Sequence, residues 1–526
     1  MRQTAAPSDL VEELDGGGRA ASPSSDTVRP WEIATLAIVV ASFICIGLWL
    51  ITTGPPLGHD ESVYALRARY FAGEPAEGTY WADYRAPGLP AMLRLAYVIR
   101  PSDAALRNVP LVLAALLIVL TWVWGRHLFG RAAGILAAAL LAFTPGFMRY
   151  AWQILLDIPG AAFSLAAIVV FTLASSGDRL RSWVLLAIPF AGAATAVRYG
   201  APVFVCAGIA AVALTRWRSL RSRPWLALAA IGGSVIGMLA VLTVPVLTGS
   251  DRAPWIAFRD FRVKKGNPLG GGLRDFAEVG PALLGRFVGW IVAAGLVLCA
   301  VGAARRWLDR RALVTAFTTL TLVVIGLGMT LGQGVGNYLA PALVPLMILA
   351  AGGLTAGLAR VPPPVSVAAV AGFLVIAPAL ASDEGSRATG SLHRAFDGLR
   401  RAATRTAERV PDDCVVFTSF TPQVGWYSRC TAIGFAPPMY ASHQNPPDGE
   451  SLVRDWLVTW VWPRVGDRSP AFLLQVIGGK RSPIDPVLAA MLPRLDDRIV
   501  QVGRPRTGRR GFVTVRPLDI RRRAWT

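Results

Sequence analysis

The chain has few charged residues. They make up 16% of its 526 residues, against about 25% in an average soluble domain. The formal net charge is nevertheless +20, because Arg and Lys outnumber Asp and Glu by 53 to 33. The arginines are spread between apolar stretches and form no single basic face, so nucleic acid is not an expected partner.

The sequence also lacks the order of a cleavable signal and any visible internal repeat. Residues 1–30 are mostly polar, rich in Ser, Gly and acidic residues, and no short apolar core follows a basic start. Such a composition cannot bury enough apolar surface to fold alone. We expect residues 1–30 to be a disordered cytoplasmic tail.

Long apolar runs are abundant instead, since hydrophobic residues make up 53% of the chain. Runs of roughly 17 to 25 residues, the length that crosses the hydrocarbon core as a helix, recur as far as residue 382. The sequence therefore predicts an α-helical polytopic membrane protein with about eleven transmembrane helices in residues 31–382. The predicted spans are 31–53, 104–125, 132–150, 158–175, 182–198, 200–215, 225–247, 281–303, 312–331, 338–358 and 365–382.

Arginine clusters between alternate spans set the predicted topology. Cytoplasmic loops carry an excess of Arg and Lys, and this places the N-terminus inside the cell and an outer loop at 54–103 outside the cytoplasmic membrane. The stretch 87–100 is apolar but only about 13 residues long, which favours a helix lying in the interface. The clusters are Arg126 with Arg131, Arg179 with Arg181, Arg216 to Arg223, Arg305 to Arg311, and Arg360.

Residues 383–526 are polar and contain short alternating runs such as 414–418 and 472–477, which are typical of strands. We expect an extracytoplasmic soluble α/β domain, with an amphipathic helical segment near 393–408. Cys414 and Cys430 are its only cysteines. An exported domain allows a disulfide between them, and two free thiols are equally compatible with the sequence.

An acidic pair, Asp60 and Glu61, follows the first predicted span directly. A carboxylate beside a bilayer loses hydration, and this cost is usually tolerated where the charge binds a cation, a proton or a substrate. The run after Asp60 has helical spacing, with Val63 and Leu66 on one side. Asp60 could therefore also serve as a helix cap.

Three more sites could join this pair on the outer side. The loop Trp81 to Gly88 holds Asp83 and Arg85, and a guanidinium can grip a phosphate at two oxygens. Asp157 precedes Pro159 at the outer start of a span. Arg198 lies alone at an outer turn, against the positive-inside bias, which suggests a bound anion. Arg85 could instead only snorkel to headgroups, and Asp157 could only cap its helix.

The order of these elements resembles the GT-C glycosyltransferases. The elements are Asp60-Glu61 after the first span, Arg-Ala-Pro-Gly at 85–88, Leu-Asp-Ile-Pro at 156–159, and a basic residue closing the fifth span. The resemblance is to the family that includes protein O-mannosyltransferases and the aminoarabinose transferases of lipid A, and it covers about residues 31–345.

This resemblance implies transfer of a sugar from a polyprenyl-phosphate donor to an extracytoplasmic acceptor in the cell envelope, with membrane lipids as further partners. Asp60 would be the catalytic carboxylate, supported by Glu61 and Asp157. Asp60 and Asp157 could also ligate a divalent cation, Mg²⁺ or Mn²⁺, and no organic cofactor is expected. Arg85 and Arg198 stand where relatives often have lysine and would hold the donor phosphate.

The donor pocket is expected to include Tyr64, Asp83 and Tyr338. Relatives usually have Arg before the tyrosine of the last motif, whereas this chain has Asn337, so no phosphate contact is expected there. A carboxylate base opposite the leaving phosphate would invert the sugar. The alternatives are a transporter or flippase of an anionic or lipid-linked solute, and a scaffold. Transporters usually place their charges near the middle of the membrane.

Overall fold

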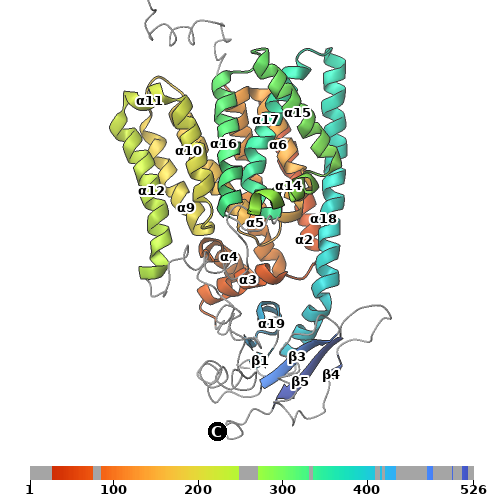
Figure 1. Cartoon of the computed structure of the whole chain (residues 1–526). Helices are drawn as coiled ribbons and strands as arrows, with labels where there is room; N and C mark the ends of the chain where they lie inside the picture. The colour runs from red at the N-terminus through yellow and green to blue at the C-terminus, as the bar shows by residue number, and fades with distance from the viewer. Residues whose placement is uncertain are drawn as a thin grey trace, which may run out of the picture.

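The computed structural model shows a helical bundle that carries a small sheet at one end (Figure 1). It describes residues 27–74, 85–247, 271–330, 336–408, 415–417, 421–433, 471–477, 500–501 and 512–518. The helices are α2 (Pro30–Thr52), α3 (His59–Phe71), α4 (Gly88–Ile99), α5 (Asp103–Phe129), α6 (Arg131–Ala142), α7 (Pro145–Ala151), α8 (Asp157–Ala174), η1 (Ser182–Leu186), α9 (Ala187–Val197), α10 (Pro202–Thr215), α11 (Trp217–Ser222), α12 (Pro224–Leu247), α14 (Gly271–Leu284), α15 (Arg286–Ala304), α16 (Arg310–Thr330), η2 (Gly336–Leu339), α17 (Ala340–Leu358), α18 (Pro363–Ala407) and α19 (Thr421–Ser428).

Within the described residues, eight helices are long and apolar enough to cross a membrane. The number rises to nine if α6 and α7, which meet at a bend of 64°, form one span. Two further predicted spans coincide with shorter apolar helices, at 182–197 and 202–215. The protein is thus a mostly helical, multi-pass membrane protein, and the count of eleven spans stays a prediction. The stretch at 87–100 is the 12-residue α4, as expected for a helix too short to span.

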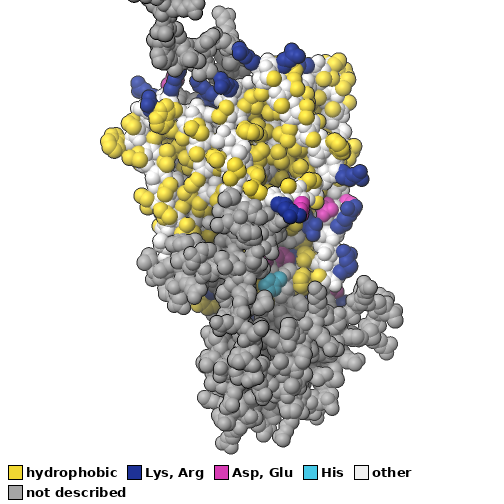
Figure 2. Space-filling model, in the orientation of Figure 1, with side chains coloured by type: hydrophobic (Ala, Val, Ile, Leu, Met, Phe, Trp, Pro, Cys, Tyr) yellow, Lys and Arg dark blue, Asp and Glu magenta, His cyan; other side chains and the backbone are white. Residues whose placement is uncertain are grey.

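The outer surface of the bundle is an apolar belt, with Lys and Arg side chains along the end farthest from the sheet (Figure 2). Large side chains such as Trp225 and Trp290 are 82% and 77% exposed. Inside the belt, helices approach closely where side chains are small. A Cβ added at Gly353 of α17 would lie 2.0 Å from the Gly295 carbonyl oxygen of α15, so these two backbones touch.

Helix α18 leaves the bundle without a break and runs on to Ala407 at the sheet end (Figure 1). The predicted domain boundary at 382/383 and the predicted helix at 393–408 therefore fall within one 45-residue helix. The strands are β1 (Val415–Phe417), β2 (Thr431–Ile433), β3 (Ala471–Ile477), β4 (Val500–Gln501) and β5 (Phe512–Leu518).

The strands form one sheet in the order β2-β1-β3-β5-β4. β1 is parallel to β2 and β3, with Val415 opposite both Thr431 and Ala471, whereas β5 is antiparallel to β3 and β4. Strands β1 and β3 lie where the alternating runs predicted them. Much of 383–526 lies outside the described residues, so the α/β character of the whole region stays a prediction.

Helices α3, α4 and α19 share one core between the bundle and the sheet. Leu57, Tyr64 and Leu89 are buried in it, and Trp426 and Tyr427 of α19 pack against it. In Figure 1, α3 and α4 lie directly below the bundle, with α19 beneath α3. This platform carries Asp60 and Glu61.

Candidate active site

Asp60 is the second residue of α3 and forms an ion pair with Arg85. The helix begins at His59 because Gly58 is its N-cap, and the Gly58 amide donates to the Glu61 carboxylate at 2.8 Å. Nη2 of Arg85 donates to Oδ1 of Asp60 at 2.8 Å. The Asp60 side chain is 52% exposed, whereas the Arg85 side chain is 9% exposed. The carboxylate is therefore reachable from outside, and its arginine is held in place.

A second pair joins Asp157 and Arg198. Asp157 is the first residue of α8, and Arg198 follows the last residue of α9. Nη1 of Arg198 contacts Oδ1 of Asp157, and both side chains are buried. The start of α8 thus brings the Asp157 carboxylate to the Arg198 guanidinium at the end of α9. A negative charge is also favourable at the N-terminus of α8 because of the helix dipole.

Two tyrosines lie over the two arginines. The Arg85 guanidinium is 5.4 Å from the centre of the Tyr64 ring, and that of Arg198 is 5.0 Å from the centre of the Tyr338 ring. An arginine over an aromatic face is stabilised by the electrons of the ring. Each carboxylate thus belongs to an Asp–Arg–Tyr group, and the two groups come from distant parts of the sequence.

The tyrosine hydroxyls show that the two groups converge. Burial is the main factor raising the pKa of Tyr338 to about 12, with Asp157 raising it further and Arg198 lowering it. The charges of Asp60 and Arg85 also act on this pKa. Burial likewise raises the pKa of Tyr64, on which Arg85, Asp60 and Asp157 all act. The backbone geometry agrees, because a Cβ at Gly88, three residues after Arg85, would lie 2.5 Å from the carbonyl oxygen of Ala196, two residues before Arg198.

The predicted residues Asp60, Asp157, Arg85 and Arg198 are therefore gathered at one end of the bundle, with Tyr64 and Tyr338 beside them. A neutral phenol at physiological pH can donate a hydrogen bond and cannot act as a base. The tyrosines can thus orient an oxygen-rich ligand, and the arginines can bind an anion.

Glu61 has a different environment from Asp60. Arg107 Nε and Nη2 donate to its two oxygens at 2.9 and 2.8 Å, and the Ile154 amide donates to Oε1 at 3.1 Å. Its side chain is 3% exposed. Since Ile154 lies three residues before Asp157, Glu61 connects the two acidic segments. This saturated carboxylate suits positioning better than proton transfer.

Two predicted sites fall partly outside the described residues. Asp83 lies outside them, so its place in the donor pocket stays a prediction. Cys430 is disulfide-bonded, but Cys414 also lies outside the described residues, and their pairing stays a prediction. Cys45, Cys206 and Cys299 are free.

Arginine charges oppose a divalent cation at the two predicted ligands, Asp60 and Asp157. No three His, Cys, Asp or Glu side chains converge to ligate a metal in the described part of the chain. Asp60 and Asp157 each face an arginine, whose charge opposes a cation at the same oxygens. The metal ligation expected from the resemblance stays a prediction, and no chemical step below uses it.

Sequence reasoning missed Arg107 and His59. Arg107 lies within the first predicted span after the outer loop. An arginine in a membrane span is costly unless it is paired, so its position alone could have marked it as a functional or structural residue. His59 directly precedes the acidic pair. Partial desolvation lowers the pKa of His59 although the residue is exposed; the Asp60 charge opposes this effect, and the Arg85 charge adds to it. His59 is therefore neutral beside the aspartate at neutral pH.

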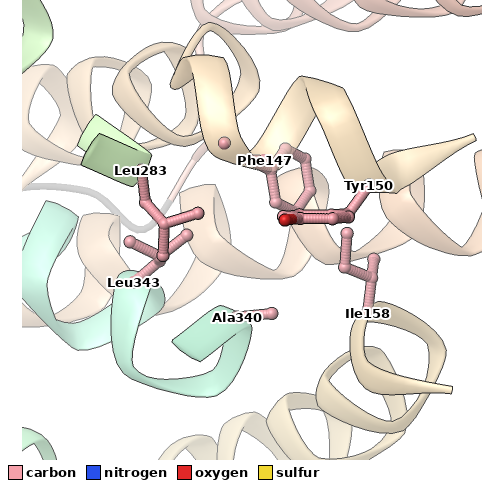
Figure 3. Close-up of a pocket in the computed structure, with 7 residues that line it drawn as sticks. Phe147, Tyr150, Ile158, Leu283, Ala340 and Leu343 are labelled. Carbon is pink, nitrogen blue, oxygen red and sulfur yellow. The ribbon is translucent and has the colours of Figure 1, made fainter. Parts of the chain in front are cut away.

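A small apolar pocket of about 10 Å³ lies between α7, α8, α14 and α17, and Ile158 and Ala340 are among its lining residues. Figure 3 shows the Tyr150 hydroxyl pointing toward the side where Leu283 and Leu343 lie.

Known proteins share this arrangement of helices. A model of the family described as dolichyl-phosphate-mannose-protein mannosyltransferase matches residues 84–245. No curated protein matches the chain as a significant relative. The crystal structure of ArnT from Cupriavidus metallidurans bound to undecaprenyl phosphate superposes with a TM-score of 0.61 at 15% identity, over 93% of this chain and 98% of that one.

A second similar structure is the archaeal oligosaccharyltransferase AglB from Archaeoglobus fulgidus, in complex with an inhibitory peptide and a dolichol phosphate. Its TM-score is 0.54 at 16% identity, over 84% of this chain and 69% of that one. The resemblance stated from the sequence is confirmed, and the chain has the GT-C fold.

Proposed function

We propose that this GT-C chain transfers a sugar from a polyprenyl phosphate to an acceptor on the outer side of the cytoplasmic membrane. The observation that carries the proposal is that the Asp60–Arg85 and Asp157–Arg198 pairs lie on segments whose backbones touch, where a Cβ at Gly88 would be 2.5 Å from the Ala196 carbonyl oxygen. A lipid phosphate has the matching chemistry, with an anionic head and an apolar tail. The similar structures of ArnT and AglB, which hold undecaprenyl phosphate and dolichol phosphate, support the same donor class.

The proposed topology follows from the arginine clusters. The N-terminus and the arginine-rich turns would face the cytoplasm, and α3, α4 and the sheet would face outward. Figure 2 supports this assignment, because the Lys and Arg side chains at the end of the apolar belt farthest from the sheet have few Asp or Glu beside them, whereas those nearer the sheet are mixed with Asp and Glu. The donor tail would stay in the lipid while its phosphate reaches the arginines.

In the proposed reaction, the acceptor hydroxyl oxygen attacks the anomeric carbon while the bond from that carbon to the phosphate oxygen breaks. Asp60 takes the hydroxyl proton, and the electron pair of the broken bond stays on the phosphate. Arg85 and Arg198 stabilise the charge that grows on this leaving group. Attack opposite the phosphate gives a single displacement with inversion.

Asp60 is the better base of the two aspartates because it is the accessible one. Its side chain is 52% exposed, whereas that of Asp157 is 6% exposed and faces Arg198. Donor phosphate competing for Arg85 would release Asp60 toward the acceptor. Asp157 would then hold Arg198 in place, and Tyr64 and Tyr338 would orient the donor.

The test compares wild type with Asp60→Asn in membranes given labelled polyprenyl-phosphate sugars, with mannose, arabinose, glucose and an amino sugar as head groups. General-base removal should slow transfer by about 100- to 10,000-fold. Asp383→Asn is the matched control, because Asp383 is an exposed acid on α18 paired only within its own helix. A folded Asp60→Asn protein that transfers sugar at the wild-type rate would refute the assignment.

In a transporter, the charged residues would line the path that the solute takes through the bilayer. The charged groups described here lie at helix ends beside α3 and α4, and no observation in the described residues favours transport over transfer. The head group that the wild type transfers identifies the sugar.

A further inference from the structure

The turn between α2 and α3, residues 53–58, is held by side chains at every residue. Two of the side chains come from α5 and α3. Arg107 donates to the carbonyl oxygens of Pro55 and Pro56, and Glu61 accepts the Gly58 amide at 2.8 Å. The turn leads directly into Asp60, so its geometry sets where the carboxylate points.

The other contacts come from the C-terminal part of the chain. The Tyr427 hydroxyl of α19 accepts a hydrogen bond from the Leu57 amide at 2.6 Å and donates one to Asp103 Oδ2 at 2.7 Å. Trp426 donates its indole N–H to the other oxygen of Asp103 at 2.7 Å. Both oxygens of this carboxylate at the start of α5 are thus used by adjacent residues of α19.

Helix α18 contacts the first part of the same turn. Arg400 Nη1 donates to the Gly54 carbonyl oxygen at 2.7 Å. His393 Nε2 lies 3.2 Å from the Thr53 carbonyl oxygen. Three side chains from residues 393–427 therefore touch a turn that lies more than 300 residues earlier in the sequence.

Helix α3 also holds α19 in return. Arg69, in the last turn of α3, donates to the carbonyl oxygens of Gly425 and Arg429 at 3.2 and 3.3 Å. The Arg69 side chain is 8% exposed. Contacts at both ends of α3 join it to α19, so the two helices behave as one unit.

Burial keeps the Tyr427 phenol in the form that this network needs. Burial raises the pKa of Tyr427 above its usual range, and the charge of Asp103 raises it further. The proton stays on the phenol oxygen, which donates to Asp103 and leaves a lone pair for the Leu57 amide. One hydroxyl thus links the C-terminal part of the chain, the start of α5 and the turn before Asp60.

We propose that Tyr427 is a positioning residue for the reaction, which fixes Asp60 through the Leu57 amide and Asp103. The inference rests on the proposed role of Asp60 as base. It gives the C-terminal part of the chain a task in catalysis, namely to hold the turn that aims the carboxylate. Loss of the hydroxyl frees the turn while the aromatic ring keeps its packing.

The first experiment measures backbone amide hydrogen exchange in the purified full chain, comparing wild type, Tyr427→Phe and Tyr70→Phe. Tyr427→Phe should speed exchange in peptides covering residues 55–62 and leave distant helices unchanged. Tyr70→Phe removes a hydroxyl from the exposed side of α3 and should match wild type. Unchanged exchange at 55–62 in Tyr427→Phe overturns the proposal.

The second experiment separates positioning from stability. With a polyprenyl-phosphate sugar that the wild type accepts, Tyr427→Phe should lower kcat by about 10- to 100-fold, because small displacements of a catalytic group are costly. The donor KM should stay within about twofold, since the phosphate-binding arginines remain in place. Faster exchange at 55–62 with an unchanged kcat would also overturn the assignment.

Asp103→Asn provides the second variant if Tyr427→Phe folds poorly. An amide in place of the carboxylate cannot accept from both Trp426 and Tyr427 with the same geometry, so exchange at 55–62 should again rise. Exchange at the wild-type rate would count against the proposal. The exchange measurements need no substrate. A wild type that transfers no sugar would therefore refute the proposed function, while exchange would still judge the role of Tyr427.

Discussion

Glu61 and Arg107 meet through two parallel hydrogen bonds of 2.9 and 2.8 Å, with side chains that are 3% and 1% exposed. A buried ion pair of this kind contributes little relative to an apolar pair, but breaking it leaves an uncompensated charge. The same Glu61 also accepts the Ile154 amide, so the pair sets the spacing between the Asp60 and Asp157 segments.

Glu61→Gln should therefore destabilise the protein by about 3–5 kcal/mol, because the buried Arg107 loses its counter-charge. Thermal unfolding of the purified protein measures this. Glu278→Gln is the control, because Glu278 and Arg274 form an ion pair whose side chains are 64% and 86% exposed. An exposed pair contributes about 0–1 kcal/mol. If the two variants lower stability equally, the Glu61–Arg107 pair does not stabilise the fold more than an exposed pair does.

Arg85→Lys and Arg198→Lys should each raise the donor KM. Lysine keeps the charge but loses the planar fork that holds two oxygens. Losing one charge-assisted hydrogen bond costs about 1.5 kcal/mol, which corresponds to roughly a tenfold change in affinity. Kinetics with a polyprenyl-phosphate sugar measure the effect.

Arg94→Lys is the control for these two variants, because Arg94 lies on the exposed side of α4. Its donor KM should equal that of wild type. If Arg85→Lys and Arg198→Lys also keep the wild-type KM, neither arginine binds the donor phosphate.

Gly88 couples the Arg85 loop to the Arg198 turn. A Cβ at Gly88 would lie 2.5 Å from the Ala196 carbonyl oxygen and 2.8 Å from the Val197 amide nitrogen. Both are backbone atoms, so Gly88→Ala must push α4 away from the end of α9. We expect at least a tenfold loss of transfer, since the two arginines would no longer face one ligand.

Gly280→Ala is the matched control, because nothing lies within 4 Å of a Cβ at Gly280 of α14. It should be neutral or slightly stabilising, as alanine favours a helix. If Gly88→Ala transfers sugar at the wild-type rate, the reaction does not depend on this close contact between the two loops.

The sequence allowed prediction of those features that follow from local chemistry. Apolar length predicted the helices, and the predicted outer positions of Asp60, Arg85, Asp157 and Arg198 pointed to a shared site. Only the family resemblance set Asp60 apart from Glu61 at the sequence level, because the two residues are adjacent and have the same chemistry. Only the fold shows that Glu61 faces the buried Arg107 while Asp60 faces outward.

The contacts of α19 were beyond sequence reasoning for a different reason. Tyr427 and Leu57 are 370 residues apart, and neither belongs to a pattern that singles it out. The continuity of α18 was also missed, because its composition changes from apolar to polar near residue 382 while the helix itself continues. A helix can continue across such a change in composition when tertiary contacts stabilise its polar half.

His59 makes protein stability depend on pH. Partial desolvation lowers its folded pKa from the usual value of about 6.5 although the residue is exposed, with Asp60 opposing the shift and Arg85 adding to it. Above pH 6.5 the imidazole is neutral in both states and contributes nothing. As the pH falls below 6.5, the unfolded chain takes up a proton that the folded chain does not, so stability is lost until the folded pKa is reached.

We therefore expect the melting temperature of the wild type to fall more steeply between pH 7 and pH 5 than that of His59→Gln. Glutamine keeps a polar side chain of similar reach but does not titrate. The measurement is thermal unfolding of both proteins at several pH values in the same detergent and salt. Parallel curves would mean that His59 is protonated equally easily in the folded and unfolded chains, and that it does not lie neutral beside Asp60.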